Sequence, residues 1–154
     1  MKKEDLKEAI CDFRTDMSVA ALRFMNIIEK KALKPYNVSI ISGKIMLVIV
    51  HFNKISQSEI ANYVYTSNSN LSQRLDFLEK EGLIIRISDG DKKDKRKVII
   101  SPTEKGEELF WEVYGKVKAI KKKVLDNFSK EELEAHIKFV AKMSNILDKV
   151  EINK

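Results

Sequence analysis

The spacing of apolar residues changes at Gly82 from the period of a helix to that of a strand. The segment before it carries leucines three and four residues apart, at Leu71, Leu75 and Leu78. Residues 83–87 are instead rich in β-branched side chains, 88–91 carry turn signals, and 97–100 have the pattern of a returning strand. Gly82 stands where a left-handed helix end is preferred. The pattern predicts a helix that leads directly into a β-hairpin.

A second, shorter helix is predicted just before this one. Ser56 and Glu59 have the spacing of a capping box, in which each side chain accepts a hydrogen bond from the backbone N–H of the other residue. The next helix is expected to start within residues 66–70, where several short polar side chains could cap it. Two short helices joined by a tight turn form a helix-turn-helix.

Long helices are predicted on both sides of this unit. An apolar stripe indicates a helix over roughly residues 4–33, and Pro35 is expected to end it. Ser39 is expected to cap a near-continuously apolar helix that reaches Phe52 and forms the most buried element. The stripe of the first helix consists of Leu6, Ile10, Phe13, Met17, Ala21, Phe24 and Ile28.

Two further helices are predicted after the hairpin. The first begins beyond Pro102 and Gly106 and is interrupted only by Gly115. The second opens at a capping box formed by Ser129 and Glu132. Its apolar face consists of Leu133, Ile137, Val140, Met143, Leu147 and Val150. The predicted fold class is therefore mainly α (α+β).

Length, cysteine content and hydropathy restrict the class of protein. The chain has 154 residues, about one domain's worth, and its single cysteine, Cys11, cannot form an intrachain disulfide. The longest apolar run, 45–50, is far shorter than the ~20 residues of a membrane-spanning helix. The first residues lack the apolar stretch of a secretory signal. We therefore expect a soluble cytoplasmic protein without membrane contact.

A basic cluster lies at the tip and return arm of the predicted hairpin. The net charge is +6, from 29 basic and 23 acidic residues, and residues 92–97 carry five positive groups against one negative group. A cluster of this kind makes a focused positive potential, which favours an anionic partner. The alternative interpretation is a solvated turn. A second run, Lys121 to Lys123, is better explained as an exposed helix face than as a DNA contact.

Taken together, these segments resemble the MarR family of winged-helix transcription regulators over essentially the whole chain. The resemblance is carried by 56–61, by 75–84, and by 94–97 followed by 103–106. It implies one MarR-type domain over 1–154, with a helical dimerisation region at 1–34 and 107–154. It also implies a DNA-binding lobe at 38–104, with a recognition helix at about 67–81 and a wing at about 84–100. Such a homodimer is expected to bind a palindromic operator, commonly as a repressor.

The recognition helix has the residue types that the major groove requires. Asn and Gln side chains can bind adenine edges in a bidentate manner, and Arg suits guanine. One Ser or Asn suffices as N-cap, so the remaining polar residues favour a reading role. The candidates are Ser67, Asn68, Ser69, Asn70, Gln73 and Arg74.

The wing is expected to contact the minor groove and the phosphates. Arg96 is the candidate for insertion into a narrow minor groove, whose negative potential attracts arginine. The family pattern implies that Asp94 holds the Arg96 guanidinium. Lys92, Lys93, Lys95 and Lys97 would contact phosphates, which fix register without reading sequence.

Several alternatives remain open at the level of sequence. Cys11 is a candidate redox sensor, although a free cysteine on a helix is usually an apolar filler. No cofactor and no metal site is expected, since the two histidines and Cys11 lie on three different helices and zinc needs at least three ligands. His51 is instead expected to be a core or interface residue. No phosphate loop or nucleophile motif supports an enzyme.

Two further questions concern function and regulation. A winged-helix protein-interaction module without DNA binding is the main rival, although it would have little reason to keep Arg96 and the polar run at 67–70. The resemblance implies a small-molecule effector that releases DNA, with no indication of its identity. The operator sequence, and repression as opposed to activation, cannot be deduced from the residues.

Overall fold

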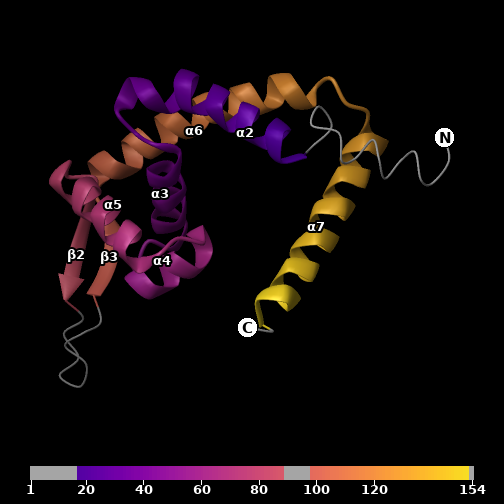
Figure 1. Ribbon diagram of the computed structural model, residues 1–154. Helices are drawn as coiled ribbons and strands as arrows, with labels where there is room; N and C mark the ends of the chain where they lie inside the picture. Colours follow the sequence, from indigo (N-terminus) through magenta and orange to yellow (C-terminus); the bar gives the residue numbers. More distant parts are fainter. Residues whose placement is uncertain (1–16, 89–97, 153–154) are drawn as a thin grey trace. The chain divides into compact units, whose positions relative to one another are not determined.

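The computed structural model describes residues 17–88 and 98–152, which form helices and one small sheet (Figure 1). The elements are α2 (Met17–Ile28), η1 (Glu29–Leu33), η2 (Lys34–Tyr36), α3 (Ile40–Phe52), β1 (Ile55–Ser56), α4 (Gln57–Val64), α5 (Asn68–Lys80), β2 (Ile84–Ser88), β3 (Val98–Pro102), α6 (Glu104–Leu125) and α7 (Lys130–Ile152). The chain divides into two compact units between Val117 and Lys118. Each unit is described separately.

The end of the first described helix differs from the prediction. The chain does not leave helical geometry at Pro35, because α2 passes into the π-helical turn η1 and then the 3₁₀ turn η2. Pro35 is accommodated in the first turn of η2, where its missing N–H costs nothing. The helical path ends at Asn37, whose φ of 56° is left-handed. The sequence position was correct to within two residues, but the terminating residue was wrong.

Helix α3 is the buried centre of the first unit, as predicted. Ser39 caps it by accepting a hydrogen bond from the backbone N–H of Ser42 at 3.1 Å. Ile45 and Ile49 are fully buried. The interpretation of His51 as a core residue is wrong, because the side chain is exposed and makes an edge contact with Phe52, with ring centroids 4.7 Å apart.

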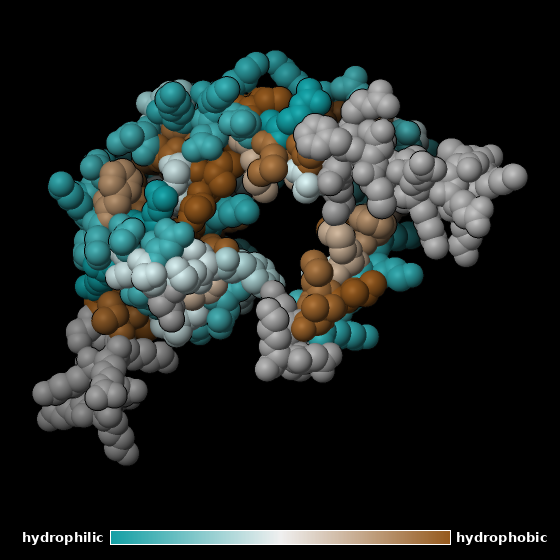
Figure 2. Space-filling view, in the orientation of Figure 1, coloured by the Kyte–Doolittle hydropathy of each residue, from teal (hydrophilic) through white to brown (hydrophobic). Residues whose placement is uncertain are grey.

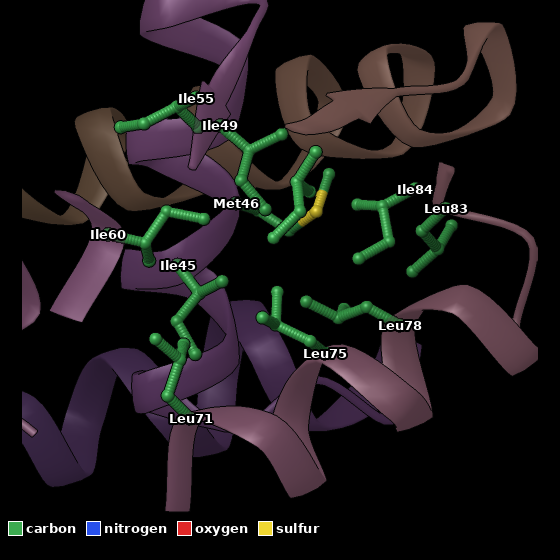
Figure 3. Packing of buried hydrophobic residues seen from close by; sticks show 11 residues of the cluster. Ile45, Met46, Ile49, Ile55, Ile60, Leu71, Leu75, Leu78, Leu83 and Ile84 are labelled. Carbon is green, nitrogen blue, oxygen red and sulfur yellow. The ribbon is translucent and has the colours of Figure 1, made fainter. Parts of the chain in front are cut away.

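The helix-turn-helix forms where the sequence predicted it. Both hydrogen bonds of the capping box are present, from Glu59 N–H to Ser56 Oγ and from Ser56 N–H to Glu59 Oε2. The inner faces of α3, α4 and α5 meet the sheet in one core (Figure 3). Its members are Ile45, Met46, Ile49, Ile55, Ile60, Leu71, Leu75, Leu78, Leu83, Ile84 and Ile100. This core holds α5 by one face and leaves the opposite face exposed.

The sheet contains a strand that the sequence pattern did not reveal. Its order is β1-β3-β2, with both pairs antiparallel. The predicted hairpin is confirmed by the pairing of β2 with β3, which runs from Ile84–Pro102 to Ser88–Val98. The additional strand β1 has two residues and pairs Ile55 with Ile100. A strand of two residues is too short to show a period of its own.

The start of α6 is docked onto the end of α5. Gly82 has the left-handed φ of 69° that its position predicted. Thr103 Oγ1 donates to the backbone oxygen of Gly82 at 2.7 Å and accepts from the N–H of Gly106 at 3.0 Å. Lys105 Nζ donates to the backbone oxygen of Glu81 at 2.6 Å. These bonds satisfy carbonyl groups that the end of a helix would otherwise leave without partners.

The second unit contains the end of α6 and the whole of α7. The predicted capping box at the start of α7 is present. Glu132 N–H donates to Ser129 Oγ, and Ser129 N–H donates to Glu132 Oε2. The large apolar side chains of α7 are extensively exposed in this single chain, and Figure 2 shows hydrophobic side chains gathered on this helix. They are Ile137, Phe139, Val140, Ile146, Leu147 and Val150.

No single described helix is long and apolar enough to cross a bilayer, and only the bent pair Ser18–Tyr36 and Ile40–Phe52, with 74° between its halves, meets the length and composition conditions jointly.

Candidate DNA-binding surface

The polar run before and within the first turn of α5 contains the N-cap of the helix and further polar residues. Ser67 is the N-cap, and its Oγ accepts from the backbone N–H of Asn70 at 3.4 Å. Ser69 and Ser67 hydroxyls lie 3.2 Å apart on the exposed surface. The first residue of the helix is Asn68. Capping of the helix therefore accounts for Ser67.

One face of α5 is an exposed polar stripe, which we call the reading stripe. Its members are spaced four, three and four residues apart: Ser69, Gln73, Asp76 and Lys80. This spacing places them on one side of the helix. The three leucines at 71, 75 and 78 have no exposed surface and fix the other side. Gln73 thus extends from a helix that cannot rotate about its own axis without unpacking the core.

Arg74 lies away from the reading stripe. Its Nη1 donates to Ser39 Oγ at 3.4 Å, which connects α5 to the N-cap of α3. The side chain is half-buried, and it forms part of the wall of a hollow of about 490 Å³. Of the recognition-helix candidates, Arg74 is therefore the one whose side chain the structure directs toward the neighbouring helices.

The hollow combines basic, polar and apolar groups. Three of its lining residues are basic, one is acidic, and Phe77 and Val38 supply apolar surface. The charge balance favours a ligand with a negative group, and Ser39 and Ser42 supply hydroxyls beside it. The lining residues are Asn26, Glu29, Lys30, Lys34, Asn37, Val38, Ser39, Ser42, Arg74 and Phe77.

The candidate wing residues lie outside the described residues. This applies to Lys92, Lys93, Asp94, Lys95 and Arg96, and Cys11 also lies outside them. The strands β2 and β3, which carry the hairpin, are described and are paired along their full length. They pair Ser88 with Val98, the described residues on either side of 89–97.

Sequence reasoning missed one charged residue of this surface. Arg86 on β2 donates from Nη2 to Asp76 Oδ1 at 2.7 Å and from Nη1 to Glu79 Oε2 at 2.6 Å. Both carboxylates belong to α5, so the guanidinium joins the wing strand to the recognition helix. The three residues were visible in the sequence, but their proximity depends on how a strand packs beside a helix.

A second polar cluster connects the η2 turn with α6. The Tyr36 hydroxyl donates to Glu112 Oε1 and accepts from Lys116 Nζ, and Lys116 also lies 4.4 Å from the centre of the Tyr36 ring. The hydrogen bond from Tyr36, with the charge of Lys116, lowers the pKa of Glu112. The same hydroxyl raises the pKa of Lys116, with a smaller contribution from Glu112. The cluster favours both charged forms.

The described residues hold no group of three or more His, Cys, Asp or Glu side chains suited to a metal ion.

Comparison with known proteins shows what part of the chain and its fold are similar to. Residues 41–98 match the model of the MarR family. The fold is similar to that of the transcriptional regulator BldR from Sulfolobus solfataricus, with a TM-score of 0.72 and 24% identity over 92% of this chain and 99% of the other. It is also similar to MarR from E. coli in the apo form, with a TM-score of 0.67 and 19% identity over 92% and 98% of the two chains.

A third solved structure contains a bound ligand. NadR in complex with 4-hydroxyphenylacetate matches with a TM-score of 0.71 and 20% identity, over 88% of this chain and 94% of the other. The family match and these structures confirm the resemblance to MarR-type regulators and the winged-helix fold. The matched proteins are named as regulators, which agrees with the expectation that the chain is not an enzyme.

Proposed function

From a chain whose residues 41–98 match the MarR family and whose fold is that of MarR-type transcriptional regulators, we propose a sequence-specific DNA-binding regulator. It acts as a homodimer on a palindromic operator, as a repressor. The observation that carries this proposal is the reading stripe, a row of exposed polar side chains on a helix whose opposite face is buried in the core. The alternative, a protein-interaction module, gives no physical reason for such a row.

The N-terminal half of α5 is the proposed base-reading element. A major groove admits one helix and distinguishes all four base pairs. Ser69, Asn70 and Gln73 are the proposed contacts on the exposed side, with Asn68 beside them. The N–H groups at the start of the helix favour a nearby phosphate, together with the positive end of its dipole. Arg74 remains a proposed guanine contact, and it would have to leave Ser39 to make it.

The hairpin between β2 and β3 is the proposed wing. We assign Arg96 to the minor groove, with Asp94 orienting it, and Lys92, Lys93 and Lys95 to phosphates. Support comes from the sequence and from the paired strands β2 and β3, which flank the segment. Phosphate contacts fix the register of the protein on the duplex, whereas base contacts supply specificity.

The proposed homodimer is supported by the apolar surface that one chain leaves exposed. Ile137, Leu147 and Val150 of α7 are each more than half exposed. Exposed apolar surface of this extent marks an interaction site. We assign residues 1–34 and 107–154 to the dimerisation region and 38–104 to the DNA-binding lobe.

Release of DNA by a small effector is the proposed regulation. The hollow beside Arg74 has the volume and charge to hold a small organic anion. One structural relative, NadR, was solved with 4-hydroxyphenylacetate. An anion that takes a hydrogen bond from Arg74 would act directly on α5.

The test is a selection of duplexes from random DNA, followed by band-shift titration of the parent and the Arg96→Ala variant. We expect an inverted repeat with half-sites ~10–10.5 bp apart, centre to centre. Arg96→Ala should weaken binding strongly and flatten its salt dependence. No complex with any duplex at low ionic strength would overturn the proposal and favour the protein-interaction module.

The redox alternative has a separate test. If Cys11 senses oxidants, mild hydroperoxide should abolish operator binding by the parent and leave a Cys11→Ser variant unaffected. Equal binding by the two proteins before and after treatment would exclude this mechanism and leave the small-molecule effector.

A further inference from the structure

The guanidinium of Arg86 is committed to two protein carboxylates. Its side chain is 24% exposed, and its two terminal nitrogens lie 2.7 Å from Asp76 and 2.6 Å from Glu79. Hydrogen bonds between charged groups in this fork geometry are among the stronger polar contacts in proteins. Arg86 therefore has little remaining capacity to bind a phosphate while this arrangement holds.

One of these carboxylates lies on the surface proposed to meet DNA. Asp76 is 62% exposed and belongs to the reading stripe, three residues after Gln73. Glu79 is less exposed, at 39%, and lies one turn after Asp76. An uncompensated carboxylate at this position would repel the phosphate backbone, because DNA binding depends on positive charge. A DNA-reading helix with two acids on this side needs a counter-charge.

We propose that Arg86 is a positioning residue for DNA binding, which holds Asp76 and Glu79 against β2 and offsets one of their two negative charges on the recognition helix. This inference rests on the proposed function. Arg86 acts through the two acids, not by contact with the duplex. It also explains how α5 can carry acidic residues beside Gln73 and still approach phosphates.

The experiment is a coupled mutant series measured by band shift on the selected operator across salt concentrations. Arg86→Gln should weaken binding about tenfold, because it leaves two unpaired carboxylates beside the duplex. In a background of Asp76→Asn with Glu79→Gln, the same Arg86→Gln change should alter affinity by less than about threefold. This loss of effect is the signature of action through the acids.

Two results would overturn the inference. If Arg86 contacts a phosphate directly, the triple variant stays as weak as Arg86→Gln, and the slope of log affinity against log salt falls by about one. If Arg86 has no part in binding, Arg86→Gln matches the parent at every salt concentration. A third result would also overturn it: if the salt bridge is purely structural, the Asp76→Asn, Glu79→Gln variant that keeps Arg86 binds as weakly as Arg86→Gln, and both have lowered unfolding midpoints.

Controls separate charge and folding from position. Lys44→Gln removes one positive charge at an exposed site on α3, outside the proposed contacts and the dimerisation region, and should leave operator affinity within about twofold of the parent. Circular dichroism checks that each variant is folded. If Arg86→Gln is unfolded, Arg86→Lys replaces it, with an intermediate loss expected because an ammonium is not a bidentate fork. If the parent binds no DNA, the proposed function is wrong. If the parent binds DNA and Arg86→Gln has no effect on binding, only the inference about Arg86 is wrong.

Discussion

Gly106 lies directly against the backbone of Leu83. A Cβ atom built on Gly106 would lie 1.9 Å from the Leu83 carbonyl oxygen and 2.8 Å from its carbonyl carbon. The same carbonyl oxygen accepts from the N–H of Thr103 at 3.1 Å. The first turn of α6 therefore packs on the segment between α5 and β2 at a distance that only glycine permits. This contact explains why a glycine follows Thr103 by three residues.

Gly106→Ala is expected to lower the free energy of unfolding by at least about 2 kcal/mol, because backbone must move to admit the methyl group. Urea unfolding followed by circular dichroism measures this loss. Gly115→Ala is the matched control within the same helix, since its Cβ would meet nothing within 4 Å. The control should gain about 0.5–1 kcal/mol from helix propensity. Equal effects of the two substitutions would contradict the packing explanation.

Gln73→Ala should reduce discrimination at one base position of each half-site by about 1–3 kcal/mol. The reason is that Gln73 is exposed on the reading stripe and would bind a base edge in pairs of hydrogen bonds. Competition band shifts with single-base operator variants measure this effect. Gln57→Ala, at the start of α4, is the control and should leave the base preference unchanged. Uniform weakening across all operator variants by Gln73→Ala would assign it to the phosphates instead.

Leu147→Glu should convert the dimer to monomers and abolish operator binding. Leu147 is 53% exposed in the single chain, so a charge there is harmless to the monomer and disruptive only inside an interface. Light scattering coupled to gel filtration measures the mass. Lys138→Gln changes the net charge by the same amount nine residues earlier, half a turn round the helix, and should leave the dimer intact. A dimeric Leu147→Glu protein would remove this face of α7 from the interface.

Tyr36→Phe should lower stability at neutral pH and have less effect in acid. The pKa of Glu112 is lowered in the folded protein, so Glu112 stabilises the fold fully above its ordinary pKa of 4.5. This contribution to the free energy of unfolding disappears as the pH falls through the lower folded pKa. The pKa of Lys116 is raised in the folded protein, so its contribution to the free energy of unfolding is complete below the ordinary lysine pKa of 10.5. Phe keeps the ring under Lys116 and removes only the hydroxyl.

The measurement is urea unfolding of parent and Tyr36→Phe at pH 7 and pH 3. The difference in free energy of unfolding between the two proteins should narrow at the lower pH, because Glu112 takes up a proton as the pH falls through its lowered pKa. Tyr65→Phe, whose side chain is 77% exposed, is the control and should show no pH-dependent difference. If the difference in free energy of unfolding between the parent and Tyr36→Phe is the same at both pH values, the effect of Tyr36 is due to packing.

The helix boundaries of the DNA-binding lobe followed from local signals in the sequence. Ser39 and Ser56 cap the helices in which they were expected, and Ser67 is the cap among the several candidates at 66–70. Gly82 has the left-handed backbone that its position indicated. Each of these signals acts through neighbouring backbone groups, so a short stretch of sequence contains all the necessary information.

The features that sequence reasoning missed depend on contacts between distant segments. Strand β1 exists because Ile55 meets Ile100, and the Arg86 fork exists because β2 packs beside α5. His51 was assigned to the core or to an interface because it ends the most apolar helix, but its side chain is exposed in the single chain, so the core assignment was wrong. Arg74 faces Ser39, 35 residues earlier, which helical spacing alone cannot indicate.

The central position of β3 in the sheet separates the structural role of the hairpin strands from the proposed DNA-binding role of the segment that joins them. Since β3 bonds to β1 on one edge and β2 on the other, the platform is complete at Val98–Pro102 and Ile84–Ser88. Insertions or deletions between these strands would change the reach of the hairpin without moving the platform. Chains with this fold can therefore differ in the length and charge of the proposed wing, while α5, the proposed base-reading helix, keeps its position on the core.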